Sequence, residues 1–350
     1  MDRRKEYRGV EESPKESRSS VPGRICLAGE SLDWMINGPS IVGAIDLRTH
    51  VFIRRLPINT NSVAIRSEEL EKRGKVIPNS ELNSYDDENV NHFQAALKVF
   101  SGLGKGLGPI SIEARSYLPI KAGVSSSAAL ILATLASLQQ YYGTNFTRQE
   151  LCSLAYQAEN SELKTGSGFM DFYACTLGGV RYLNCSSNPP YTEEGRNFSD
   201  IKIVLVDTLV PHNTRKFISS KRRRYDEREP YIIRYADLTE RVVEEIKLLL
   251  PQFGDNIETI GEYVYRCHTY LRDYMHSSTE LLDQCVDVCM QNGAYGAKLT
   301  GTGKGGCMFA LATEDSVAAI LQQLAALPIK ARVINFSEEG LRFESGPFPA

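Results

Sequence analysis

Three consecutive serines, Ser125, Ser126 and Ser127, precede a long apolar stretch that starts at Ala128, and Gly123 lies two residues before them. We expect a helix from about Ser126 to Tyr142, which Gly143 ends. Small residues at a helix start expose several backbone N–H groups and hydroxyls to one point, where the helix dipole also favours an anion. A serine-rich helix cap is the simpler alternative, but a cap needs only one hydroxyl. Because Gly123 gives the backbone room to approach a ligand, we favour a phosphate site at this helix start.

A second glycine-rich stretch runs from Leu299 to Cys307 and has four glycines in six positions. Such a loop can surround a polyphosphate or let two strands approach closely. It formally matches the GxGxxG pattern of dinucleotide-binding proteins, but that pattern opens a helix, whereas the residues after Cys307 look like a strand. The GxxxxGK[ST] phosphate loop and the HRD and DFG motifs of protein kinases are absent from the sequence.

Together with Pro22–Trp34, these stretches resemble the three ordered motifs of the GHMP small-molecule kinases, the family of galactokinase, homoserine kinase, mevalonate kinase and phosphomevalonate kinase. The first stretch is similar to the galactokinase signature GRxNLxGEHxDY in the spacing of its Arg, Glu and Asp, whereas the mevalonate branch carries a Lys at the Arg24 position. The segment from Thr165 to Asp171 resembles the galactokinase CGIMDQ region, with Phe172 in place of the Gln.

Other positions follow or leave the galactokinase pattern. His212 and the run Arg222–Arg224 resemble its VRH…YPVRRRQ stretch, although an exposed basic loop explains the run equally well. Ser31 replaces the usual His, Pro211 replaces an Arg, and Ser219 falls where galactokinases have a Tyr that contacts the sugar. These departures concern the identity of the sugar and not the kinase chemistry.

The resemblance implies roles for the acidic residues and one arginine. Asp171 would accept or orient the proton of the acceptor hydroxyl, and Arg24 would offset charge on the transferring phosphoryl group and keep Asp171 ionised. Ser126 and Glu159 would bind Mg²⁺. Taken singly, Arg24 and Asp171 could instead form an ordinary salt bridge.

The resemblance also implies two binding sets. ATP would contact the two small-residue loops, at Gly123, Ser125, Ser126, Ser127, Ala128, Gly303 and Gly305. The substrate would contact Glu30, Ser31, Asp33 and Asp171. Because Glu30 and Asp33 would accept hydrogen bonds from hydroxyls, a neutral polyol suits this set better than a carboxylated substrate such as mevalonate. A solvated turn is the plain alternative for Glu30 and Asp33.

The order of strand and helix patterns predicts an α+β protein of two domains with a cleft between them. We expect residues 1–20 to form a mobile arm, because they are charged and nearly free of aliphatic residues. The first domain would cover residues 21–190 and the second residues 200–350, divided by a linker near 186–200. The family resemblance implies a βαβ-type first domain and a ferredoxin-like second domain.

Composition limits the partners. The 350 residues carry a net charge of −3, which gives no electrostatic support for nucleic-acid or membrane-surface binding. The N-terminal residues do not form a secretory signal, so we expect a cytoplasmic protein, as monomer or homodimer. Eight cysteines are scattered singly and are expected to be reduced; Cys285 and Cys289 share a helix face, which favours core packing over a metal pair.

We therefore predict an ATP- and Mg²⁺-dependent, galactokinase-like sugar kinase. A mevalonate-type kinase is the first alternative, because Gly38–Ile41 followed by Ala44–Asp46 resembles that branch. The second alternative is a non-catalytic sugar and ATP sensor, although the Ser-Ser-Ala-Ala run that such paralogues can lose is complete here at Ser126–Ala129.

Overall fold

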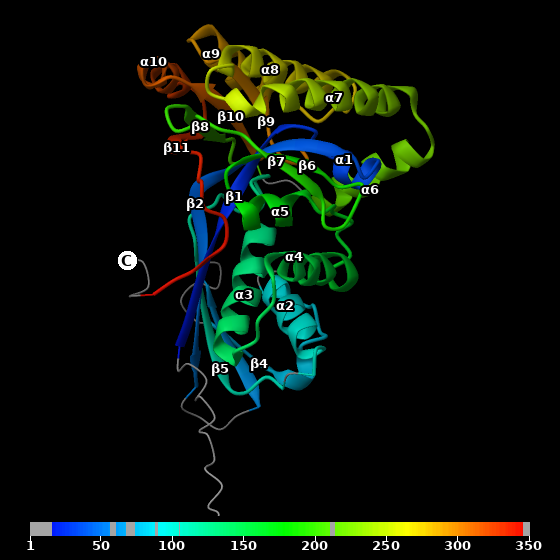
Figure 1. The fold of residues 1–350 in the computed structure, drawn as a ribbon, viewed down its shortest axis with the longest axis vertical. Helices are drawn as coiled ribbons and strands as arrows, with labels where there is room; N and C mark the ends of the chain where they lie inside the picture. The colour runs from blue at the N-terminus through cyan, green and yellow to red at the C-terminus, as the bar shows by residue number, and fades with distance from the viewer. Residues whose placement is uncertain are drawn as a thin grey trace, which may run out of the picture.

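Two β-sheets organise the chain in the computed structural model, which describes residues 16–56, 61–67, 74–87, 90–104, 106–210 and 214–345. The first sheet has the order β12-β1-β2-β5-β3-β4, with β6 pairing with β2 and β7, and the second has the order β11-β8-β10-β9. In Figure 1 the first sheet runs along the molecule and the second lies near the top, beside helices α7 to α10. The strands are β1 (Glu16–Ala28), β2 (Pro39–Arg55), β3 (Ser62–Ser67), β4 (Lys75–Pro78), β5 (Ile110–Ser116), β6 (Val180–Asn184), β7 (Tyr191–Glu194), β8 (Lys202–Asp207), β9 (Gly296–Leu299), β10 (Cys307–Ala312), β11 (Lys330–Asn335) and β12 (Arg342–Phe343).

Helix α3 (Ser126–Tyr142) is the centre of the first half because it is apolar on nearly all sides and is therefore buried. It packs against β1 and β2 and against its neighbours α2 (Asn91–Ser101) and α4 (Arg148–Gln157). Its bounds are those predicted from the sequence, and Gly143 ends it in the left-handed conformation at φ 63°. The short helices α1 (Leu32–Met35) and α5 (Met170–Leu177) complete this half.

The second half has the predicted ferredoxin-like arrangement. Numbered along the chain, its four strands have the order 4-1-3-2, and all neighbours are antiparallel. Helices α7 (Pro230–Leu249), α8 (Ile257–Asp273) and α9 (Glu280–Gln291) connect β8 to β9, and α10 (Glu314–Leu324) connects β10 to β11. Helix α6 (Thr214–Asp226) precedes them.

The domain limits differ from the prediction at both ends. The predicted arm, residues 1–20, is too long, because β1 begins at Glu16 and residues 1–15 lie outside the described part. Polar residues stay in this strand because their hydroxyls bind the backbone of α3: Ser17 Oγ donates to the carbonyl of Ser137 at 2.8 Å and Ser19 Oγ to that of Ala133 at 2.7 Å. The predicted second domain, residues 200–350, is also too long, since β12 pairs with β1 in the first sheet.

All eight cysteines are unpaired and buried, which confirms the prediction of reduced thiols. Cys285 and Cys289 lie on the buried face of α9, in the core of the second half. Among the described residues, none of the helices has the length and apolar character that crossing a membrane requires.

Candidate active site

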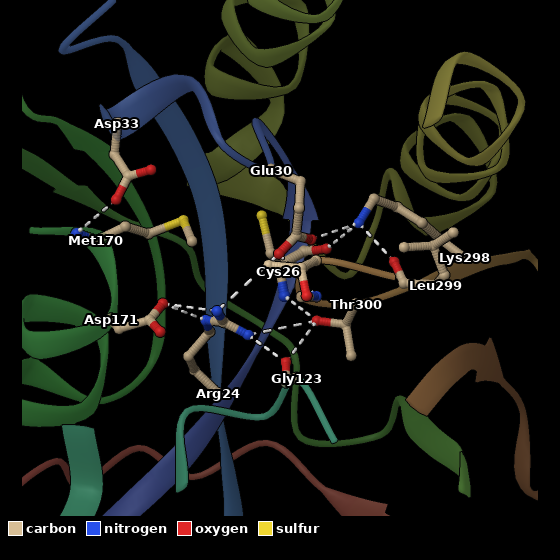
Figure 2. Close-up of polar contacts among 12 residues, drawn as sticks. Arg24, Cys26, Glu30, Asp33, Gly123, Met170, Asp171, Lys298, Leu299 and Thr300 are labelled. Carbon is tan, nitrogen blue, oxygen red and sulfur yellow. Dashed lines mark hydrogen bonds and ion pairs between the residues drawn. The ribbon is translucent and has the colours of Figure 1, made fainter. Parts of the chain in front are cut away.

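Arg24 and Asp171 form the centre of the site. Arg24 lies on β1 beside an irregularity in its pairing with β2, and Asp171 lies in the first turn of α5. Arg24 donates to Asp171 Oδ1 from NH2 at 2.6 Å and from Nε at 2.8 Å, as Figure 2 shows. Burial by itself would lower the pKa of Arg24, but the carboxylates of Asp171 and Glu30 outweigh it and hold that pKa above its ordinary value. The arginine is buried, whereas the Asp171 side chain is 25% exposed, so Asp171 can meet a ligand.

Asp33 lies on the same side of Arg24 as Asp171 (Figure 2). It is held in α1, where its Oδ2 accepts a hydrogen bond from the backbone N–H of Met170 at 3.3 Å. Burial, and then the nearby charge of Asp171, raise its pKa from 3.8 to about 7. A Cβ at position 168 would overlap the Asp33 carboxylate, so the glycine there leaves room for this carboxylate. Ser31, the buried residue before α1, has a left-handed backbone at φ 72°.

Glu159 is a buried carboxylate close to the start of α3. It lies in the π-helical turn Ala158–Glu162, and its Oε1 accepts a hydrogen bond from Ser127 Oγ at 3.0 Å. Burial, and then the charge of Asp171, raise its pKa from 4.5 to about 7. The sequence suggests Ser126 as the second Mg²⁺ ligand, and that pairing stays a prediction. In the structure the serine hydroxyl that binds Glu159 is that of Ser127, because successive residues of a helix point about 100° apart.

A divalent cation fits beside Glu159, because the carboxylate and the Ser127 hydroxyl offer oxygen ligands. The carboxylate is also a buried negative charge that has no ion-pair partner among the described residues. The described residues contain no group of three or more His, Cys, Asp or Glu side chains that could hold a metal alone. The pair is thus suited to Mg²⁺, which commonly takes one or two protein oxygens and completes its shell with phosphates and water.

The two glycine-rich loops lie against each other. Gly123 has φ +84° and Gly301 has φ +79°; a Cβ on Gly123 would overlap the carbonyl oxygen of Thr300, and one on Gly301 would overlap the Cα of Gly123. The loops are also joined by hydrogen bonds, since the N–H of Cys307 donates to the carbonyl of Ala122 at 2.8 Å. The glycines therefore allow close backbone approach, the second of the two roles considered for the late loop.

The expected ATP contacts divide between these loops. Ser125, with φ 62°, is the N-cap of α3, and Ser126, Ser127 and Ala128 form the first turn of that helix. At the other loop, Gly303 lies against the carbonyl of Ser277 and Gly305 against that of Val210. Within the described part of the chain, the Ser125 side chain does not cap α3, and N–H groups at a helix start can bind an anion. That ATP contacts the residues of these two loops stays a prediction.

Glu30 has a different role from the one the sequence suggested. Its side chain is 3% exposed, and both oxygens accept from protein donors: Oε2 from Lys298 Nζ at 2.8 Å and Oε1 from the N–H of Gly301 at 2.7 Å. Lys298 itself is fully buried. We therefore infer that Glu30 holds Lys298 and the backbone at Gly301 in position, whereas the sequence suggests that it contacts a substrate hydroxyl.

Sequence reasoning missed three residues of the second half that reach the site. Lys298 pairs with Glu30, Thr300 Oγ1 accepts from the N–H of Cys26 at 3.2 Å, and Lys221 donates to the carbonyl of Thr302 at 2.8 Å. The available signal was a charged Lys298 inside an otherwise apolar strand, Gly-Ala-Lys-Leu.

The arginines of the run Arg222–Arg224 make different contacts. Arg222 donates to the carbonyl of Gly166 at 3.1 Å and lies 5.3 Å from the ring centre of Trp34, whereas Arg224 binds Glu229. Ser219 is exposed and donates to a carbonyl of its own helix, so it does not replace the missing Tyr. The predicted resemblance at Pro211 and His212 lies outside the described residues.

Comparison with known proteins agrees with this geometry. Residues 91–179 match the model of the GHMP kinases N-terminal domain, and residues 246–330 match that of the GHMP kinases C-terminal domain. The chain is 28% identical to a mevalonate kinase of Thermococcus sibiricus over 93% of this chain and 98% of that protein. It is 26% identical to a galactokinase of Thermosipho africanus, over 86% and 90% of the two chains.

Among solved structures, Lactococcus lactis galactokinase complexed with galactose superimposes with a TM-score of 0.81 at 21% identity, covering 94% of this chain and 95% of the other. Its two-domain fold is the one described above. With both family domains matched in order, the chain belongs to the GHMP kinase family.

Proposed function

We propose that this kinase transfers the γ-phosphoryl group of ATP to a hydroxyl of a monosaccharide or a closely related polyol. The observation that supports this most directly is the partly exposed Asp171 carboxylate, which Arg24 holds at 2.6 Å and beside which Asp33 offers a second acceptor. Two carboxylates suit the hydroxyls of a neutral acceptor and would repel a carboxylated one.

In this proposal the chain's own residues position the reactants. The acceptor hydroxyl lies against Asp171, which takes its proton as the oxygen bonds to the γ-phosphorus and the bond to the β-phosphate oxygen breaks, so that ADP leaves. The guanidinium of Arg24 stabilises negative charge on the transferring group. The N–H groups at the start of α3 bind phosphate oxygens.

Mg²⁺ would be held by Ser127 and Glu159, and when bound it neutralises charge on the β- and γ-phosphates. Its positive charge would also compensate Glu159, whose pKa is raised by burial in the free protein. The burial of Glu159 therefore explains its raised pKa and supports a cation beside it.

A mevalonate kinase is the second candidate, because seven of the similar curated proteins carry that name at 27% or 28% identity. Arg24 and Asp33 favour the galactokinase-like function, since both follow the spacing of that branch.

The test is ADP release with Mg²⁺-ATP over neutral hexoses, pentoses, hexosamines, uronic acids, cyclitols and mevalonate, with Asp171→Ala as control. We expect turnover of one neutral acceptor, and its loss in the control. Turnover of mevalonate alone would replace the sugar assignment. Acceptor-dependent ATP binding without turnover would instead favour the sensor.

A further inference from the structure

Lys298 is a fully buried charge in an apolar strand. Its Nζ donates to Glu30 Oε2 at 2.8 Å, to the carbonyl of Cys26 at 2.9 Å and to the carbonyl of Leu299 at 2.7 Å. An ammonium group has three protons, so each has an acceptor. A strand of the second half is thereby attached to β1 and to the residues that follow it (Figure 2).

Glu30 and Asp171 lie on two sides of one guanidinium. The NH2 nitrogen of Arg24 is 2.6 Å from Asp171 Oδ1 and 4.0 Å from Glu30 Oε1. Charges therefore alternate along the series Lys298, Glu30, Arg24, Asp171, with an ion pair at each end. Both carboxylates are close enough to attract the Arg24 guanidinium, and Lys298 forms an ion pair with Glu30.

We propose that Lys298 is a positioning residue, which binds Glu30 and so leaves Arg24 committed to Asp171. The proposal rests on the proposed function only in that Arg24 and Asp171 are the pair that acts in phosphoryl transfer. Without the lysine, Glu30 would be a buried carboxylate with the N–H of Gly301 as its remaining donor, and it would draw the guanidinium toward itself.

A second buried cation does not replace Lys298. Lys221 lies near enough to Glu30 for their charges to interact, but its Nζ donates to the carbonyl of Thr302 at 2.8 Å. Turning it toward Glu30 would break that bond to the glycine-rich loop.

The first test reads the position of Arg24 directly and needs no substrate. Crystal structures would be determined for Lys298→Met, Glu30→Gln and the double variant. We expect the Arg24 guanidinium to move toward Glu30 in Lys298→Met, with loss of the bond to Asp171, and to return to Asp171 in the double variant. An unmoved Arg24 in Lys298→Met overturns the proposal. If that variant does not fold, Lys298→Gln, which keeps a donor for Glu30 but removes the charge, takes its place.

The second test separates kcat from KM. We expect Lys298→Met to lower kcat about tenfold or more while KM for ATP and acceptor changes less than about twofold, because the pair acts in the transition state. The double variant should regain most of this loss, since it removes the competitor as well. A double variant as slow as Lys298→Met contradicts the competition. Absence of turnover in the wild type would count against the proposed function alone, since the crystal structures still decide the position of Arg24.

Discussion

Replacing Asp33 with Asn should stabilise the free protein at neutral and alkaline pH. Burial and the charge of Asp171 raise the pKa of Asp33 from 3.8 to about 7, and this difference makes the ionised form about 4 kcal/mol less favourable in the folded state than in the unfolded one. The group is 6% exposed, so solvent screens little of this effect. An Asn keeps an oxygen for the N–H of Met170 and carries no charge. We expect a gain of about 2 to 4 kcal/mol in the free energy of unfolding at pH 8.

The sign of the pH dependence follows from the raised pKa. In the wild type, the stability associated with Asp33 is fully present below pH 4 and is lost as the pH rises through about 7, because the folded state then gives up a proton it holds more tightly than the unfolded state. The gain from Asp33→Asn should therefore be absent at pH 3.5 and complete at pH 8.

Urea unfolding without ATP, Mg²⁺ or acceptor measures this gain at pH 3.5, 5, 6.5 and 8. Asp200→Asn is the matched control, because Asp200 is exposed and lies far along the chain from the site. A gain for Asp33→Asn that is equal at all four pH values, or no larger than that of Asp200→Asn, would refute the reasoning. The stabilised variant should lose activity toward the acceptor, as expected where a functional group is held at a cost in stability.

Two further predictions concern the contacts around this centre. Ser127→Ala should raise the Mg²⁺ concentration needed for half-maximal rate by about tenfold, whereas Ser126→Ala should change it less than about twofold; equal effects in a Mg²⁺ titration would contradict the assignment of Ser127 to Glu159. Gly168→Ala should raise KM for the acceptor at least about tenfold, because the new methyl group would displace the Asp33 carboxylate; an unchanged KM in steady-state kinetics, with KM for ATP as the internal control, would show that Asp33 does not contact the acceptor.

Local patterns allowed the central helix and its flanking site to be predicted. Helix α3 could be bounded in advance because an apolar run lies between small polar residues and Gly143. The sequence does not predict which serine faces Glu159. Ser126 and Ser127 point about 100° apart around the helix axis, and composition does not determine the rotation of the helix.

Long-range pairing set the other limit. The family resemblance predicts Glu30 as a substrate contact. Its partner in the structure, Lys298, lies 268 positions away in the other sheet, so the sequence does not reveal this pair. Nothing local distinguishes a carboxylate that faces a substrate from one that neutralises a buried lysine. The family resemblance predicts which residues form the site, but only the structure shows which side chains contact them.

The pairing of β12 with β1 has a consequence for the order in which the protein is made. Ser19 pairs with Phe343, and Arg48 in β2 donates to the carbonyls of Glu339 and Gly340 at 3.1 Å and 2.6 Å. A ribosome therefore synthesises the whole of the second half before the first sheet receives its last strand. Arg24 lies on that same β1, so the nascent chain completes the sheet that carries Arg24 only after both halves have been translated.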